Sequence, residues 1–260
     1  MATEARKNSK QSAREAAQAA KAASEAQQKK RDRTITMIGI AVVVVIVGAI
    51  VAIVLVANKS ANSVALPNTV TSPTYGFPVG SAPSTTPTVQ LFEDFQCPIC
   101  AQFERGGNVA ALEASALAGN MQLSLHPMIF IDQNQNNDSS IRATNAWGCA
   151  INAGVGVRYH STVFRNQPKV EGTGYTQAQL IQFGVDSGIK GAALTTFTKC
   201  VNSTTYQPWA NKSEDYASSK GVNGTPTILV NGKPFDLTPY APTFSQPAKL
   251  VAAILAAGKK

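Results

Sequence analysis

The longest apolar stretch of the chain covers residues 35–57, 23 positions without a charged side chain, consisting mainly of valine, isoleucine and alanine. At about 1.5 Å per residue a helix of this length reaches roughly 34 Å, enough to cross a hydrocarbon layer of about 30 Å. A buried core helix is usually shorter and keeps a polar face. A cleaved signal peptide would have shorter basic and apolar regions than these. The pattern therefore predicts one transmembrane helix.

Beyond this stretch, short runs of β-prone or alternating apolar residues predict strands. An Asn-Gly pair at 231–232 is a strong hairpin signal between the last two runs, and Pro234 confines the final one to a sheet edge. The first run, from 75, places the start of the folded domain near residue 74. The expected strands cover residues 75–79, 88–92, 121–130, 227–230 and 233–237.

Helical spacing dominates the region between the third and fourth expected strands, about 139–220, where no good strand pattern occurs. An inserted helical domain is the simplest account of it. The polar residues 132–138 predict a loop before this insertion, and Pro247 to Ala257 predicts a helix that covers the sheet. The expected fold class is α/β with a helical insertion. The helices expected within the insertion cover residues 139–153, 157–166, 176–187, 194–203 and 207–220.

The positive charge of the chain is concentrated at its N-terminus. Residues 1–33 hold nine Lys or Arg against four Asp or Glu, which is +5 of the net charge of +8. The remainder is only mildly basic and has no basic cluster interleaved with aromatic residues, so nucleic-acid binding is not expected. Because the basic residues precede the apolar span, the tail is expected in the cytoplasm and the rest outside. We expect a cytoplasmic tail (1–34), a transmembrane helix (35–57), an extracytoplasmic linker (58–73) and a folded domain (74–260).

Candidate chemistry is concentrated in Cys97-Pro98-Ile99-Cys100, which follows the expected strand at 88–92. Proline is favoured at the first position of a helix, and the positive end of the helix stabilises a thiolate on the cysteine that begins it. The pattern predicts thiol–disulfide exchange, with Cys97 as the exposed nucleophile and Cys100 as the resolving thiol. An inert disulfide and half of a zinc site are the alternatives. Zinc needs two more ligands at suitable spacing, and none form a motif, so no metal is expected.

The order of these elements resembles the DsbA-like branch of the thioredoxin superfamily over about residues 74–260. The resemblance rests on Cys97-Pro98-Ile99-Cys100, on Phe92-Glu93-Asp94-Phe95 ahead of it, and on Thr225-Pro226 before the fourth strand. The family implies that Pro226 is cis and faces the cysteines, and that the Thr225 backbone pairs with an extended substrate. The anchor and the second cysteine pair are similar to secreted oxidoreductases of actinobacterial type.

Two positions depart from the family pattern. Many relatives carry a buried proton-accepting acid six residues before the first cysteine, where this chain has Leu91; Glu93 and Asp94 are the nearest acids. The most oxidising relatives have a histidine where this chain has Ile99, which offers the thiolate no charge or hydrogen bond. Glu93 and Asp94 are therefore candidate supporting residues, and a less oxidising protein is expected.

The remaining cysteines, Cys149 and Cys200, both lie in the expected insertion. Four cysteines allow three connectivities, and pairing of Cys97 with Cys100 leaves a 149–200 disulfide. A structural disulfide is the favoured interpretation, and a second redox relay is the alternative.

Aromatic and histidine residues outside the motif are assigned no chemistry. Trp147 and Trp209 are expected in the core of the insertion. His126 and His160 are expected at the surface or in the groove, without a catalytic role.

The main hypothesis is an extracytoplasmic thiol:disulfide oxidoreductase that introduces disulfides into exported proteins through Cys97 and Cys100. The alternatives are a disulfide isomerase or reductase of exported proteins, and an anchored peptide-binding module with an inert disulfide. The expected partners are reduced exported proteins and, as the resemblance implies, a vitamin K epoxide reductase-like or DsbB-like membrane oxidase. No cofactor is expected.

Overall fold

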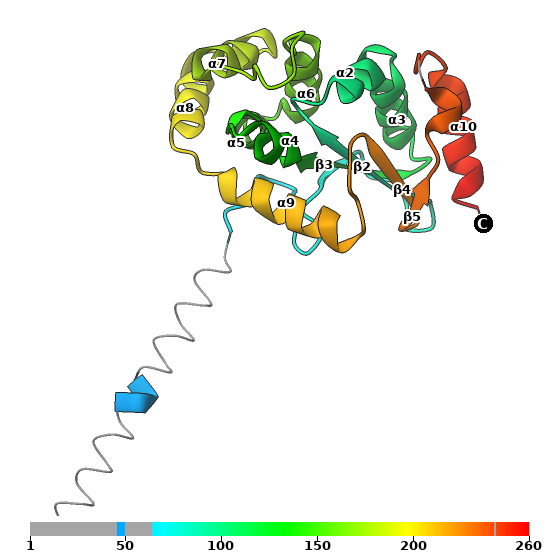
Figure 1. The fold of residues 1–260 in the computed structure, drawn as a ribbon, viewed down its shortest axis with the longest axis horizontal. Helices are drawn as coiled ribbons and strands as arrows, with labels where there is room; N and C mark the ends of the chain where they lie inside the picture. Colours follow the sequence, from blue (N-terminus) through cyan, green and yellow to red (C-terminus); the bar gives the residue numbers. More distant parts are fainter. Residues whose placement is uncertain (1–45, 50–63, 242, 260) are drawn as a thin grey trace, which may run out of the picture. The chain divides into compact units, whose positions relative to one another are not determined.

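A computed structural model describes residues 46–49, 64–241 and 243–259 (Figure 1). The tail and most of the expected span, 35–57, lie outside these residues; 46–49 form a turn of helix. Among the described residues, no helix has both the length and the apolar character needed to cross a bilayer. Residues 64–260 form one compact unit, described here by itself.

The core of this unit is a five-stranded sheet in the order β1-β3-β2-β4-β5. The central strand β2 runs parallel to β3, and the other three pairs are antiparallel. Pro234 lies in an edge strand, as expected. The strands are β1 (Phe77–Val79), β2 (Thr88–Asp94), β3 (Gln122–Met128), β4 (Thr227–Val230) and β5 (Lys233–Phe235).

Strand β2 is buried on both faces, which explains its run of large apolar side chains. On one face Leu91 lies in register with Leu125 and Ile228, and all three belong to the main core. Phe92 belongs to a second cluster, with Leu229 and residues of helix α9 (Gln207–Ser219). Because both faces are covered, the end of β2 delivers the cysteine motif from a rigid position.

Three helices cover the sheet beside the motif: α2 (Pro98–Arg105), α3 (Asn108–Leu117) and α10 (Pro247–Ala257), which packs on α3 (Figure 1). Gly106 and Gly107 separate α2 from α3, as expected from a pair of glycines within a helical pattern. Gly107 has a left-handed φ of 77°, which favours glycine. A Cβ at Gly106 would collide with the carbonyl oxygen of Phe244. Both glycines therefore permit the sharp turn between α2 and α3.

The five helices from α5 to α9 correspond to the helices expected in the insertion, with bounds shifted by a few residues. Trp147 and Trp209 are fully or almost fully buried, and their ring centroids lie 5.4 Å apart. The last of these helices, α9, packs against β3 and so covers the sheet itself. The others are α5 (Ser139–Asn152), α6 (Gly156–Arg165), α7 (Gln177–Asp186) and α8 (Gly191–Asn202).

The expected loop at 132–138 is partly wrong, because a short helix, α4 (Phe130–Gln135), occupies its first half. Ile131 is buried there, and Asp132 accepts hydrogen bonds from the backbone N–H groups of Ser140 (2.8 Å) and Ile141 (2.9 Å). Asp132 therefore caps α5, whereas the side chain of Asp138, the residue at the N-cap position, makes no capping hydrogen bond. A cap supplied from a preceding helix leaves no local sequence signal.

Candidate active site

The cysteine motif forms the first turn of α2, directly after the end of β2. Pro98 is the first residue of the helix and Cys97 is its N-cap, whose Sγ accepts a hydrogen bond of 3.4 Å from the backbone N–H of Cys100. Cys97 is 4% exposed and Cys100 is fully buried, and both are free thiols. The expected order of exposure is correct, although Cys97 is much less exposed than its position suggested.

The two thiols have opposite acidity. A hydrogen bond from the Cys100 side chain is the largest cause that lowers the pKa of Cys97 from the usual 9.0 to about 6. The Thr225 side chain and the backbone N–H groups of Cys100 and Ile99 add to this lowering, and burial opposes it. Burial raises the pKa of Cys100 well above its usual value, and its interaction with Cys97 raises it further. At neutral pH this arrangement provides one nucleophilic thiolate and one protonated partner.

Cys97 of the reduced protein is expected to react with iodoacetamide at a rate that reaches half its maximum near pH 6. Since the folded pKa is lowered, the thiolate stabilises the reduced fold fully above the unfolded pKa, and this contribution disappears as pH falls through about 6. In Cys100→Ala the midpoint should move upward, because the largest stabilising hydrogen bond is lost. A wild-type midpoint near the unperturbed value of about 8.5 would contradict this assignment.

Thr225 and Pro226 face the cysteine motif from the start of β4. Their peptide bond is cis, as the family resemblance implied. The Cys97 thiol donates a hydrogen bond of 3.4 Å to the Thr225 carbonyl oxygen, although the two residues are 128 positions apart. The Thr225 hydroxyl is buried. The structure thus brings together the two pieces of sequence that carried the resemblance.

Ile99 is 44% exposed beside Cys97, one of the few large apolar side chains exposed among the described residues. Its backbone N–H helps to lower the pKa of Cys97, but its side chain supplies no polar group.

Ile99→His is expected to make the protein more oxidising, because an imidazolium stabilises the Cys97 thiolate and therefore the reduced state. One interaction of about 1.4 kcal/mol corresponds to a rise of about 30 mV for a two-electron couple. Equilibration with a glutathione buffer measures the shift, with Ile99→Val as the apolar control. A potential unchanged or lowered in the histidine variant would contradict this role of position 99.

Glu93 and Asp94, the two acidic candidates, lie in different environments. Asp94 accepts hydrogen bonds from the backbone N–H groups of Gln96 (2.9 Å) and Ile131 (3.0 Å) and from the Ser140 hydroxyl. Burial raises the pKa of Asp94 to about 8. Asp94 therefore fixes the turn before Cys97 to the neighbouring helices, whereas Glu93 interacts electrostatically with both cysteines.

Sequence reasoning missed several polar residues that support the motif. Gln167 donates hydrogen bonds to the carbonyl oxygens of Phe95 (2.8 Å) and Cys97 (2.9 Å), and the Tyr175 hydroxyl also donates to Phe95 (2.8 Å). These residues follow α6, about 70 to 80 positions away in the chain. No local pattern identifies them, because only the packed insertion brings them to the motif.

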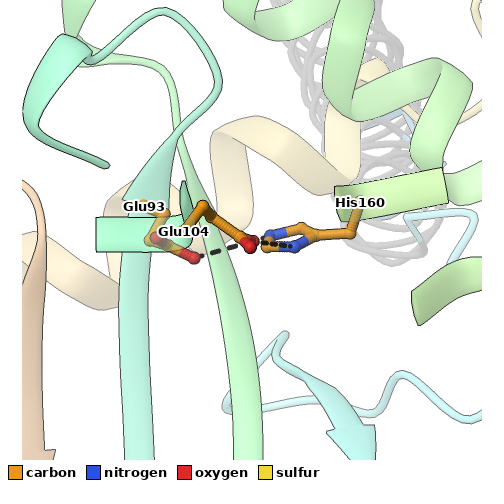
Figure 2. Close-up of side chains that lie close together, drawn as sticks. All are labelled: Glu93, Glu104 and His160. Atoms are coloured by element: carbon orange, nitrogen blue, oxygen red, sulfur yellow. Dashed lines mark ion pairs between the residues drawn. The ribbon is translucent and has the colours of Figure 1, made fainter. Parts of the chain in front are cut away.

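The expectation that both histidines lie at the surface or in the groove is wrong. His126 is 1% exposed, and burial lowers its pKa to about 3, so it is neutral. It stacks on Phe92 with a centroid distance of 4.5 Å. His160 is 2% exposed and lies 2.9 Å from Glu104 through Nδ1 and 3.6 Å from Glu93 through Nε2 (Figure 2). Of these residues, Glu104 is the one with a local sequence signal, because it follows Cys100 by one helical turn.

The second cysteine pair forms a disulfide between Cys149 of α5 and Cys200 of α8, with Cα atoms 5.8 Å apart. It joins two helices of the insertion across a sequence separation of 51 residues. This is the disulfide predicted from the sequence on the assumption that Cys97 pairs with Cys100.

Comparison with known proteins agrees with this geometry. Residues 71–246 match the family model described as thioredoxin. The crystal structure of oxidised DsbA from Mycobacterium tuberculosis is similar, with 26% identity and a TM-score of 0.54 over 69% of this chain and 90% of that chain. No curated protein matches the sequence.

Two further solved structures share the fold at lower identity. MdbA, a thiol-disulfide oxidoreductase from Actinomyces oris, is 20% identical, with a TM-score of 0.59 over 75% of this chain and 91% of its own. BdbD from Bacillus subtilis is also 20% identical, with a TM-score of 0.58 over 76% of this chain and 98% of its own. Because the family match covers more than half of its residues, the chain belongs to the thioredoxin family, and it is a DsbA-like protein thiol:disulfide oxidoreductase.

Proposed function

We propose that this protein introduces disulfides into exported proteins outside the cytoplasm by donating the disulfide formed by Cys97 and Cys100. The observation that carries the proposal is the opposite acidity of the two thiols at the start of α2. A stabilised Cys97 thiolate favours the reduced protein, and a protein whose reduced form is stabilised is an oxidant. The likeness to structures described as DsbA supports the same direction.

The reaction begins when a substrate thiolate attacks Sγ of Cys97. A mixed disulfide forms, the Cys97–Cys100 bond breaks, and its electron pair passes to Cys100, which takes up a proton. A second substrate thiolate then attacks the substrate sulfur and releases Cys97 as a thiolate, a good leaving group because its pKa is low. The substrate is oxidised by two electrons and the cysteine pair is reduced by two.

The surface around Cys97 suits an extended, unfolded substrate. Thr225 presents backbone groups next to the reacting sulfur, and the exposed side chain of Ile99 offers an apolar contact. Neither feature selects a particular side chain, which fits a protein that acts on many newly exported chains.

The reduced pair must be reoxidised in each cycle. We propose a vitamin K epoxide reductase-like or DsbB-like membrane oxidase as the partner. If residues 35–57 span the membrane with the N-terminus in the cytoplasm, the short segment between this span and the compact unit that begins at Val64 keeps the domain near this oxidase and raises its effective concentration.

Ile99 favours a second candidate function, that of an isomerase or reductase, because it provides no side-chain stabilisation of the thiolate. This function requires a supply of electrons and a pair that is kept reduced. The redox potential of the pair separates the two functions.

A stoichiometric transfer experiment tests the proposal. The oxidised protein is mixed with a reduced, unfolded secreted protein, and free thiols on both are counted after alkylation. Two substrate thiols should disappear for each Cys97–Cys100 pair reduced, and none in the Cys97→Ser, Cys100→Ser double variant. Failure of the oxidised wild-type protein to oxidise its substrate would reject the donor function.

A further inference from the structure

A buried cluster of ionisable side chains lies next to the redox pair, contributed by four different elements. Glu93 is the penultimate residue of β2, Glu104 lies on α2, Glu113 on α3 and His160 on α6. Figure 2 shows Glu93 and Glu104 converging on the imidazole of His160 from separate elements. Glu93 is 4% exposed, Glu113 7% and His160 2%.

Nothing in the described structure neutralises Glu93 by hydrogen bonding. Neither of its carboxyl oxygens has a hydrogen-bond partner there. Burying a carboxylate that accepts no hydrogen bond is very costly, so such a group holds a proton. Burial is the largest cause that raises the pKa of Glu93 well above its usual value, followed by the charges of Glu104, Cys97 and Glu113.

The cluster is coupled to the cysteines in both directions. The charge of Cys97 raises the pKa of Glu93, and the charge of Glu93 raises the pKa of Cys100. Glu104 follows Cys100 by one turn of α2, on the same face of the helix. A proton on Glu93 and a proton on Cys100 are therefore linked electrostatically.

His160 is suited to pass a proton because its two ring nitrogens approach different carboxylates. Nδ1 lies 2.9 Å from Glu104, and Nε2 lies 3.6 Å from Glu93. The second distance is too long for a hydrogen bond, so proton transfer between Nε2 and Glu93 requires a side-chain rotation that shortens it. The rings of Phe95, Trp147 and Phe164 surround the imidazole at centroid distances of 4.9 to 5.3 Å.

We propose that Glu93 and His160 form a proton relay for Cys100, which protonates the Cys100 thiolate when the disulfide opens and removes this proton when the disulfide re-forms. Many relatives carry a proton-accepting acid at the position of Leu91, where leucine can neither accept nor donate a proton. The relay takes over this role. The direction in which it runs during turnover rests on the proposed function.

Each step is balanced. When a thiolate attacks Cys97, the electron pair of the Cys97–Cys100 bond goes to Cys100, which takes the carboxyl proton of Glu93. The Glu93 carboxylate is then reprotonated from His160. In the reverse step Glu93 first passes its proton to His160 and, as a carboxylate, takes the proton of Cys100. The Cys100 sulfur then attacks Cys97, and the bond between Cys97 and the partner sulfur breaks, with its electron pair leaving on the partner sulfur.

Glu113 gives the relay an exit to solvent. It interacts electrostatically with His160 and Glu104, and burial raises its pKa to about 7. Glu113 also lines an open pocket between α3, α6 and α7, together with Arg158, Arg165 and Asp186. Protons therefore enter and leave on the face of the domain formed by the insertion. The titratable groups that face the relay from the elements around it are Cys97, Cys100, Glu104 and Glu113.

A bound cation is the competing explanation, because one ligand atom each from Glu93, Glu104 and His160 lie within 4.8 Å of one another. The geometry favours the relay: the two carboxylates approach different ring nitrogens, and an ion can use only one of them.

The test isolates the step in which the Cys100 sulfur attacks a mixed disulfide at Cys97. Reduced protein is mixed with excess oxidised glutathione, which forms a mixed disulfide at Cys97, and the release of the second glutathione is followed by rapid quenching and mass spectrometry. Wild type is compared with Glu93→Gln and His160→Gln over a range of pH. Glu214→Gln is the matched control, since Glu214 is another partly buried glutamate with a raised pKa, bonded to the Ile129 N–H.

In Glu93→Gln release should be about tenfold to hundredfold slower at neutral pH, a typical contribution of acid–base catalysis. The difference should shrink as pH rises, because hydroxide then removes the Cys100 proton. His160→Gln should show a smaller change of the same form, and Glu214→Gln should match wild type. Glutamine mimics the protonated glutamate, so the variant is expected to fold; if it did not, His160→Gln would carry the test.

Three results would overturn the relay. The first is release at wild-type rates in both variants. The second is slowing by the same factor at every pH, which a merely structural role would give. The third is a saturable rise in the thermal midpoint of the oxidised protein with zinc that Glu93→Gln abolishes, which would indicate a cation site. Failure to oxidise protein substrates would reject the proposed function and leave the glutathione result intact.

Discussion

Cys97→Ser is expected to reduce disulfide transfer to the rate of the uncatalysed reaction, whereas Cys100→Ala is expected to convert the protein into a trap. Cys97 is the N-cap of α2, is the more exposed thiol of the pair, and has a pKa lowered to about 6. Serine cannot form the mixed disulfide. Without Cys100 the mixed disulfide still forms, but no internal thiol can attack it, so substrate remains attached to Cys97.

Both outcomes are measured on one non-reducing gel after incubation with oxidised glutathione and a reduced substrate protein. The alanine variant should show a substrate-sized shift that dithiothreitol removes, and the Cys97→Ser, Cys100→Ala double variant should show none. A trap formed equally well by Cys97→Ala would assign the nucleophile to Cys100 and overturn the assignment made here.

The Cys149→Ser, Cys200→Ser double variant is expected to lose about 4 kcal/mol of unfolding free energy, the chain-entropy value for a closed loop of this length. The disulfide joins α5 to α8 across 51 residues of the insertion. Replacing both cysteines avoids a free thiol that would mispair with Cys97. Urea denaturation measures the loss, with the oxidised Cys97–Cys100 pair intact in both proteins.

The same variant separates a structural disulfide from a second redox relay. At temperatures where it remains folded, its transfer of disulfides from Cys97 should equal that of the wild type. Limiting dithiol should open the Cys97–Cys100 bond well before the Cys149–Cys200 bond. A large loss of transfer activity with little loss of stability would instead assign Cys149 and Cys200 to the redox pathway.

Much of the fold is predictable because its signals are local. The helices of the insertion follow 3.6-residue spacing, Gly106 and Gly107 mark a break, and Asn231-Gly232 marks a hairpin. Each of these features depends on neighbours within one or two turns of chain. The helix α4 is the exception, since Phe130–Gln135 is followed by a polar run and its first turn is held by a tertiary hydrogen bond, from the Ile131 N–H to Asp94.

The residues of the candidate site differ in the same respect, since some carry a local sequence signal and others do not. Cys97 and Cys100 are identified by their own spacing, and Thr225 and Pro226 by the family resemblance. His160 and Glu113 carry no local signal, because they reach Glu93 only when α6 and α3 pack beside β2 and α2. A buried histidine also resembles an exposed one in sequence, which is why the expectation for His126 and His160 was wrong.

The redox state of Cys97 in growing cells tests the donor function most directly. Cells are quenched in acid, and free thiols are alkylated with a reagent that shifts the protein on a gel. A disulfide donor with an active oxidase partner is predicted to be mostly oxidised, with Cys97 protected from alkylation. A pair that is mostly reduced at steady state would contradict the account and favour a reductase or an isomerase.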